Sequence, residues 1–292
     1  MSECEDTSIQ VDGRRRVTFL DRGPRDGVTV MYLHGFPGSR LEQCLFPYEA
    51  LERVGVRLIS VDRPGWGLTD PLAGDRVARA RDVLHVADHL GIDQFPLMAI
   101  SAGGGYGVAL AATAPTRIAR LVLVSAQAAP YDDPATITRM QPGQLAVLAA
   151  TRAGRTAGFV DGCAAFRREF LEDPIGRFWS NFATLSAAER AFIEQPEVRN
   201  TFIGDMTEGL RTSPDGVIDD LLSWPQPLEV DLTSITCPVI AIHGTDDDWE
   251  PLANLRRVID QIPDAHLWLC AGMNHLGPLL HPAAVLALTC DA

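Results

Sequence analysis

Long apolar runs are absent from this chain of 292 residues, although 46% of its residues are hydrophobic. No segment approaches the roughly 18 uninterrupted apolar residues that a membrane-spanning helix needs, so we expect no membrane partner. The first residues, MSECEDTSIQ, are acidic and lack the basic and apolar regions of a secretory signal. These absences predict a cytoplasmic protein.

Paired cysteines are also absent. The six cysteines are scattered and form no C-x-x-C pair, so the sequence offers no zinc site, and we predict neither a metal nor a cofactor. Free thiols are the expectation in a reducing compartment, while disulfides stay open. The tail TCDA is no prenylation box, because its cysteine is third from the end. The cysteines are Cys4, Cys44, Cys163, Cys237, Cys270 and Cys290.

Positive charge is scarce: 25 basic side chains, all arginine, face 38 aspartates and glutamates, giving a formal net charge of -13. A nucleic acid requires a basic patch on its protein partner, so we predict no nucleic-acid binding. Solubility explains the acidity. We expect a small-molecule substrate and a monomer or homodimer. The length suits one large domain or a core with an insertion.

What the chain does contain is an alternation of apolar runs and helical patterns in its first third. Two runs, 95–101 and 118–126, are almost continuously apolar, as expected of central parallel strands covered on both faces. Helical stretches lie at 76–92 and 105–115, the second ending at a proline. This alternation predicts an α/β fold with a doubly wound parallel sheet. Further strands of this region are predicted at 15–23, 27–35 and 55–65.

The alternation breaks after the fifth of these predicted strands. Helical patterning then dominates, and strong strand runs return only at 237–244 and 265–272. A stretch of roughly 100 residues is too long for a plain loop in a compact domain. We predict a core domain of residues 1–129 and 231–292, interrupted by a helical cap of residues 130–230.

A serine stands where the run 95–101 meets a glycine-rich, helical stretch. In a nucleophile elbow the serine occupies a strained strand-to-helix turn, and the positions two before and two after it must be small. Gly103 meets that demand, and Ala99, in place of the first glycine of G-x-S-x-G, is the next smallest residue. The alternative is a glycine-rich turn that only packs a helix against a strand. The stretch matches neither a dinucleotide fingerprint nor a P-loop, and we interpret Ser101 as a nucleophile.

The segment LHGFPGS, residues 33–39, follows another predicted strand. An H-G-x-P-G turn there would aim a backbone N–H toward the neighbouring elbow. Pro37 has no N–H, so we predict Phe36 as one donor and Ala102, the residue after the serine, as the other. Two such donors form an oxyanion hole.

Several separate motifs carry a family resemblance: HGFPGS, then DRPGWGLT, then S-A-G-G with a tyrosine two residues later. In these motifs the chain resembles the α/β-hydrolase fold family, and within it the capped bacterial esterases and proline-iminopeptidase-like enzymes. The resemblance covers nearly the whole chain. It implies a mostly parallel sheet of eight strands, a helical cap inserted after the sixth strand, and a Ser–acid–His triad.

The resemblance also implies where the acid and the base stand. The family turn H-G-x-x-D-x-x-x-P matches HGTDDDWEP and puts the acid on Asp247, with Asp246 and Asp248 as flanking alternatives. We expect at least one of the three to cap the following helix. The base falls on His275, directly after the final strand, whereas His281 begins the last helix and is interpreted as structural. The remaining histidines are also interpreted as structural: His34, His85, His89, His243 and His266.

The chain order Ser101, Asp247, His275 is the order that this fold uses. His275 takes the serine's proton during attack and returns it to the leaving group, while Asp247 orients the imidazole and stabilises its charged form. Asn274 stands where the family often has glycine, which we interpret as a tolerated variation.

The sequence therefore predicts a serine hydrolase that cleaves an ester, or else an amide, of a small and largely apolar substrate. A cofactor-free lyase, cyclase or haloperoxidase on the same three residues remains an alternative, as does a ligand receptor on a hydrolase scaffold. A proline iminopeptidase would need cap carboxylates for the substrate amine; candidates are Glu169, Glu172, Asp173 and Glu208. Cap aromatics that supply candidates for an apolar pocket are Phe159, Phe166, Phe170, Phe178, Trp179, Phe182, Phe192, Phe202 and Trp224.

Overall fold

A single sheet of eight strands organises the described part of the chain. The computed structural model describes residues 6–138, 140 and 142–290, so Cys4 lies outside the described residues. The strand order is β1-β2-β4-β3-β5-β6-β7-β8. The pairs β1–β2 and β2–β4 are antiparallel and all others are parallel. The predicted α/β fold with a mostly parallel, eight-stranded sheet is therefore confirmed.

Seven of the strands follow apolar runs that the sequence marks. The strand β1 does not, because only two of its five residues are buried and it pairs at the sheet edge. The strands are β1 (Thr7–Val11), β2 (Arg15–Arg22), β3 (Val28–Leu33), β4 (Val56–Val61), β5 (Phe95–Ile100), β6 (Ile118–Val124), β7 (Val239–Gly244) and β8 (Ala265–Cys270).

Helices cover both faces of the sheet, as the alternation predicts. Tyr32 and Met98 point to the face covered by α1 and α13, whereas their neighbours Met31 and Leu97 point to the face covered by α3, α4 and α12. The stretch 76–92, expected as one helix, forms two, α2 and α3. The core helices are α1 (Tyr48–Val54), α2 (Arg76–Ala80), α3 (Asp82–His89), α4 (Gly103–Thr113), α12 (Leu252–Ile259) and α13 (Pro282–Ala287); the 3-10 turns are η1 (Arg40–Leu45), η2 (Leu232–Ser234) and η3 (Gly277–Leu280).

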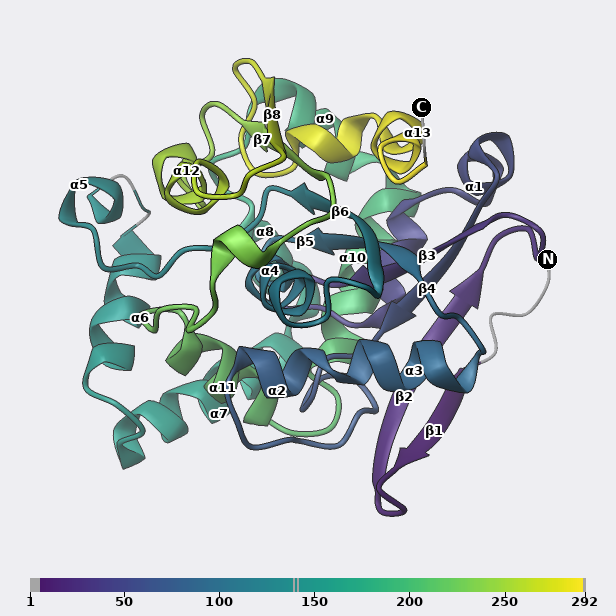
Figure 1. Cartoon of the computed structure of the whole chain (residues 1–292). Coiled ribbons are helices and arrows are strands. Elements are labelled where there is room, and N and C mark those ends of the chain that lie inside the picture. The colour runs from purple at the N-terminus through teal and green to yellow at the C-terminus, as the bar shows by residue number, and fades with distance from the viewer. Residues whose placement is uncertain (1–5, 139, 141, 291–292) are drawn as a thin grey trace.

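A helical insertion occupies the chain between β6 and β7, after the sixth strand. Figure 1 shows α5, α6 and α7 on the left of the molecule, on the opposite side from the β1–β2 hairpin. Treating residues 130–230 as a domain of its own stays a prediction. No helix in the described ranges is long and apolar enough to cross a membrane. The inserted helices are α5 (Pro134–Ile137), α6 (Pro142–Arg152), α7 (Ala157–Glu172), α8 (Pro174–Asn181), α9 (Ala187–Glu194), α10 (Pro196–Gly209) and α11 (Asp215–Ser223).

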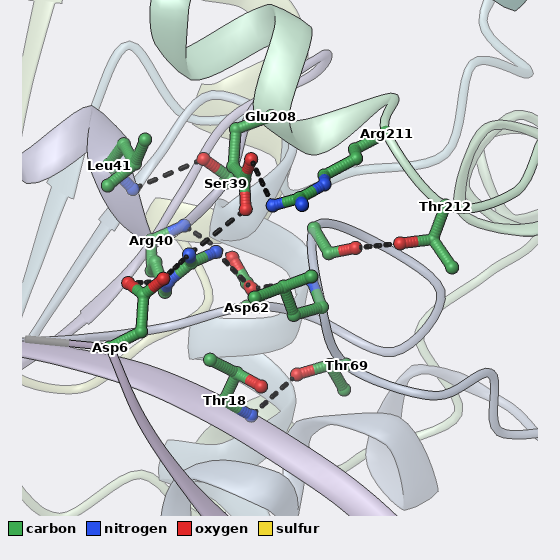
Figure 2. Close-up of polar contacts among 12 residues, drawn as sticks. Asp6, Thr18, Ser39, Arg40, Leu41, Asp62, Thr69, Glu208, Arg211 and Thr212 are labelled. Carbon is green, nitrogen blue, oxygen red and sulfur yellow. Dashed lines mark hydrogen bonds and ion pairs between the residues drawn. The ribbon is translucent and has the colours of Figure 1, made fainter.

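A buried arginine joins the insertion to the core. Arg40 in η1 is 1% exposed, and its guanidinium lies 2.8 Å from the Asp62 carboxylate of the core (Figure 2). The same guanidinium lies 3.0 Å from Glu208 of α10 and 2.7 Å from Asp6. Three carboxylates therefore neutralise one buried cation at the junction of η1 and α10.

Candidate active site

Ser101 occupies a strained turn between β5 and α4. Its φ of 49° lies in the left-handed region, which costs a non-glycine residue of order 1–3 kcal/mol unless the surroundings hold it. A Cβ on Gly103 would lie 2.6 Å from the carbonyl oxygen of Leu33. Only glycine at that position lets α4 close against the end of β3.

The alanine at position 99 fits because the helix opposite it carries a glycine. A Cβ on Gly107 of α4 would lie 2.9 Å from the Cβ of Ala99, closer than real Cβ atoms come. The methyl group that Ala99 adds to the strand is thus matched by the absence of a side chain at Gly107. This pairing explains how the turn forms without the first glycine of G-x-S-x-G.

Loops that follow β5, β7 and β8 bring three predicted residues together. The Nε2 atom of His275 lies 3.0 Å from the Ser101 hydroxyl oxygen, and its Nδ1 lies 2.8 Å from Oδ2 of Asp247. The side chains of His275 and Asp247 are 8% and 0% exposed. Trp249 stacks on the imidazole with 5.3 Å between ring centroids. The arrangement can relay a proton from the serine hydroxyl to the imidazole.

The flanking aspartates take other contacts. Asp246 accepts a hydrogen bond from the Thr245 hydroxyl, and Asp248 accepts one from the side-chain amide of Asn274. The expectation that one of the three aspartates caps α12 is wrong, because Pro251 is the N-cap and no side chain caps that helix. Asp247 instead accepts from the backbone N–H groups of its own turn, at 3.0 and 2.8 Å.

Burial and charge set the protonation of this site. Burial alone would raise the pKa of Asp247, but the charge and hydrogen bond of His275 outweigh it, so the pKa is lowered. Burial alone would lower the pKa of His275, but the charge and hydrogen bond of Asp247 outweigh it, so the pKa is raised. Burial lowers the pKa of the neighbouring His243 and so disfavours a second positive charge beside the pair.

The two predicted oxyanion donors face the same space as Ser101. Phe36 and Ala102 line one cavity with the serine, and among the described residues neither backbone N–H is paired with an acceptor. Arg63 donates to the carbonyl oxygens of His34 and Gly35, at 3.1 and 2.8 Å, and so fixes the turn that leads into Phe36.

A cavity of about 570 Å³ adjoins Ser101 and His275. Its apolar wall comes largely from the insertion, with three of the nine predicted aromatics, Phe159, Phe166 and Trp224, in the lining. Tyr131 and Glu250 contribute polar groups, and no arginine is among the described lining residues. Two of the remaining six, Phe182 and Phe202, line a second cavity of about 30 Å³ that also borders Ser101 and His275. The other four pack elsewhere: Phe170, Phe178, Trp179 and Phe192.

The four cap carboxylates considered for an amine substrate do not line this cavity. Glu169 pairs with an arginine of α8, Asp173 caps the N-terminus of α8, and Glu208 pairs with Arg40. Glu172 ends α7 outside the lining. The structure therefore gives no support to an iminopeptidase site built on these residues.

The other histidines and the cysteines do not gather into a metal site in the described part of the chain. Within the described ranges, no group of three or more His, Cys, Asp or Glu side chains converges as a metal site. His34 accepts the Arg63 backbone N–H through Nε2, and His281 is the N-cap residue of α13. The five described cysteines form no disulfide with one another.

Two functional candidates were missed in the sequence. Glu250 accepts hydrogen bonds from the Tyr131 hydroxyl and the Asn254 amide while lining the cavity, and burial raises its pKa well above the usual range. Glu189 of the insertion contacts the backbone around His275. A local signal for Glu189 was present, since Ser186 and Glu189 have the S-x-x-E spacing of a helix capping box.

Comparison with known proteins identifies the family. A model described as the alpha/beta hydrolase fold matches residues 28–282. The chain belongs to the alpha/beta hydrolase fold family. This hydrolase is 29% identical over 275 residues to a non-heme chloroperoxidase from Streptomyces lividans, covering 91% of each chain. It is 29% identical to a 2-hydroxymuconate semialdehyde hydrolase from Pseudomonas putida, covering 77% of this chain and 72% of that protein.

Other similarities are narrower or concern the fold alone. An uncharacterized hydrolase from Bacillus subtilis (strain 168) is 37% identical to our chain over 101 residues. The match covers 34% of our chain and 35% of the Bacillus protein. The solved structure of a thermophilic esterase from Thermogutta terrifontis superposes with a TM-score of 0.67 at 23% identity, covering 96% of this chain and 95% of the esterase. That likeness establishes the shared fold.

Proposed function

We propose that this hydrolase cleaves small, largely apolar carboxylic esters through an acyl-enzyme on Ser101. One observation carries the proposal: His275 lies within 3.0 Å of the Ser101 hydroxyl and 2.8 Å of Asp247, beside a largely apolar cavity. A serine hydroxyl is a weak nucleophile at neutral pH, and a neutral imidazole at this distance activates it.

The reaction proceeds in two halves. Ser101 attacks the ester carbonyl carbon while its proton passes to Nε2 of His275, and the N–H groups of Phe36 and Ala102 stabilise the oxyanion. The C–O bond to the alcohol then breaks, and His275 returns the proton to the departing oxygen. Water then attacks the acyl carbon while His275 takes its proton. The acyl C–O bond to Ser101 breaks, the carboxylic acid leaves, and His275 returns the proton to the serine oxygen.

The cavity supports an uncharged substrate over an anionic one. No arginine is in its described lining and the chain contains no lysine, so a substrate carboxylate would be buried without a counter-ion. The volume of about 570 Å³ holds a ligand of moderate size.

Covalent labelling tests the nucleophile. A fluorophosphonate probe should label Ser101 in the folded protein, located by mass spectrometry, and Ser101→Ala should lower kcat for p-nitrophenyl butyrate by about 10⁴-fold or more. Ser213→Ala, outside the cavity lining, is the matched control and should keep parental turnover. Full turnover by Ser101→Ala would refute the acyl-enzyme.

The pH profile tests the base. His275 must be neutral to accept the serine's proton, and its pKa is raised above the ordinary 6.5. Hence kcat/KM should fall in acid with a midpoint above pH 6.5, and Asp247→Asn should move that midpoint down because the carboxylate no longer stabilises the imidazolium. A profile flat from pH 5 to 8 would contradict this assignment.

Halide chemistry is the second candidate, favoured by the similarity to the Streptomyces lividans chloroperoxidase over 91% of the chain. Peroxide-dependent chlorination of a standard acceptor, measured beside ester hydrolysis, distinguishes the two. Chlorination that exceeds ester turnover would make hydrolysis the secondary activity.

A further inference from the structure

One carboxylate of the insertion accepts hydrogen bonds from the main chain on both sides of His275. Glu189 of α9 accepts the Asn274 N–H on Oε2 at 3.0 Å and the Leu276 N–H on Oε1 at 2.9 Å. The Glu189 side chain is fully buried. A bidentate carboxylate on two backbone donors is a charge-assisted contact, stronger than a neutral hydrogen bond.

The same carboxylate is fixed within its own helix. Its Oε2 also accepts the Ser186 N–H at 3.0 Å, and the Ser186 hydroxyl accepts the Glu189 N–H at 3.3 Å, which completes a capping box. The capping box fixes the Glu189 rotamer at the start of α9, so its hydrogen bonds to the backbone of residues 274–276 are held by the helix.

Asn274 adds a second link between the insertion and the same loop. Its side-chain amide donates to the Thr184 carbonyl at 3.0 Å and to Asp248 at 2.9 Å, while its Oδ1 accepts the His275 N–H at 2.7 Å. A glycine in this position could make none of these contacts. From the core side, the Ser125 hydroxyl donates to the His275 carbonyl at 2.7 Å.

We propose that Glu189 is a positioning residue for His275, through which the helical insertion sets where the imidazole stands relative to Ser101. This inference rests on the proposed serine chemistry. It makes α9 part of the catalytic support and leaves the remainder of the insertion free to shape the pocket. Loss of these two hydrogen bonds should displace the imidazole, and a small displacement of a catalytic group lowers the rate by a large factor.

The pKa of His275 distinguishes an effect of the Glu189 charge from an effect of packing alone. The ionisable groups that act on His275 are Asp247 in the loop after β7, His243 of β7, Glu42 of η1 and Glu189 of α9. After the larger effects of burial, which lowers it, and of Asp247, which raises it, the Glu189 charge further raises the pKa of His275. Glu189 also raises the pKa of Cys270 in β8, after the larger effect of burial.

The experiment compares Glu189→Gln with Glu194→Gln, an exposed glutamate on the same helix. The His275 imidazole is titrated by NMR without substrate, assigned through a His275→Asn spectrum, and kcat/KM for p-nitrophenyl butyrate is measured across pH. Glu189→Gln should lower the pKa of His275 by about half a unit or more, because a nearby negative charge is gone. It should also lower kcat/KM by about tenfold or more, while Glu194→Gln matches the parent.

A second variant tests the proposal in case Glu189→Gln does not fold. Asn274→Ala keeps the Glu189 carboxylate and removes the contacts to Thr184 and Asp248; it should lower kcat/KM by about fivefold or more with little change in the His275 pKa. A folded Glu189→Gln within threefold of the parent and with an unshifted titration overturns the proposal. Should Glu189→Gln not fold, an unchanged kcat/KM in Asn274→Ala overturns it instead. Fluorophosphonate labelling of the parent judges the serine chemistry separately, since the NMR titration needs no turnover.

Discussion

The two halves of the insertion meet the core in different ways. The anchoring half, α9 to α11 (187–223), sends buried carboxylates into the core: Glu189, Asp205 and Asp220 are 0%, 1% and 1% exposed. The lining half, α6 to α8 (142–181), instead presents mainly apolar side chains and bare glycines to the cavity, and its polar lining residues, Ser180 and Asn181, are uncharged. Among the described helices of the insertion, α11 alone does both, since Val217 and Leu221 also line this cavity.

This difference separates stability from specificity. A buried carboxylate with fixed donors cannot be removed without leaving its partner unpaired in the interior, so such positions tolerate little change. An apolar cavity wall can change shape at modest cost, because no buried polar group loses its partner. We expect mutations of the anchoring half to change the free energy of unfolding and mutations of the lining half to change substrate preference.

The largest effect is expected at Asp220. Its carboxylate takes two hydrogen bonds from Arg63, at 2.7 and 2.6 Å, and one from the Tyr106 hydroxyl at 2.6 Å. Asp220→Ala leaves the Arg63 cation buried and unpaired, which should lower the free energy of unfolding by roughly 3–5 kcal/mol in urea titrations. The control is Asp219→Ala on the same helix, where the side chain is 25% exposed and its ion pairs are longer. Equal losses in the two variants would contradict the distinction between buried and exposed anchors.

A smaller effect is expected where η1 meets α10. The Ser39 hydroxyl donates to Asp205 at 2.7 Å, and the Ser39 N–H donates to the same oxygen at 2.8 Å. Ser39→Ala removes one of these two bonds inside the protein and should cost about 1–3 kcal/mol of unfolding free energy. Thr233→Ala, which removes an exposed hydroxyl bond to Asp231, should cost less than about 1 kcal/mol. A Ser39→Ala variant as stable as the parent would show that Asp205 needs only the backbone donor.

The proximity of the three candidate site residues could be predicted because each follows a strand end. Apolar runs mark β5, β7 and β8 locally, and parallel strands place their carboxyl ends at one edge of the sheet. Ser101, Asp247 and His275 each follow such a run, so family motifs and strand order suffice to bring them together. The family turn favoured Asp247 but left its neighbours as alternatives, because a shift of one residue in a turn changes which side chain faces the base; the contact of Asp247 with His275 distinguishes it from them.

The anchors could not be predicted because their partners are distant in sequence. Ser39 and Asp205 are 166 residues apart, and nothing near either residue marks the other. Ala99 was similarly ambiguous in the sequence, because the glycine that accommodates it, Gly107, lies on the next element. The capping prediction for α12 failed because the Asp247 side chain is already used by its own turn and by His275.

The smallest effect on stability, and the sharpest test of the comparison, involves one glycine in each half. Gly162 in α7 lines the cavity and Gly204 in α10 does not, and a Cβ on either would meet nothing within 4 Å. Replacement of either glycine by alanine should therefore raise the free energy of unfolding by about 0.5–1 kcal/mol through helix propensity alone.

Only the lining glycine should change substrate preference. Gly162→Leu extends a side chain into the cavity, so kcat/KM for p-nitrophenyl octanoate should fall about tenfold relative to p-nitrophenyl acetate. Gly204→Leu, on the anchoring half, should leave that ratio unchanged. If both variants shifted the ratio equally, the two halves would act on the pocket as one body, and the separation of anchoring from lining would fail.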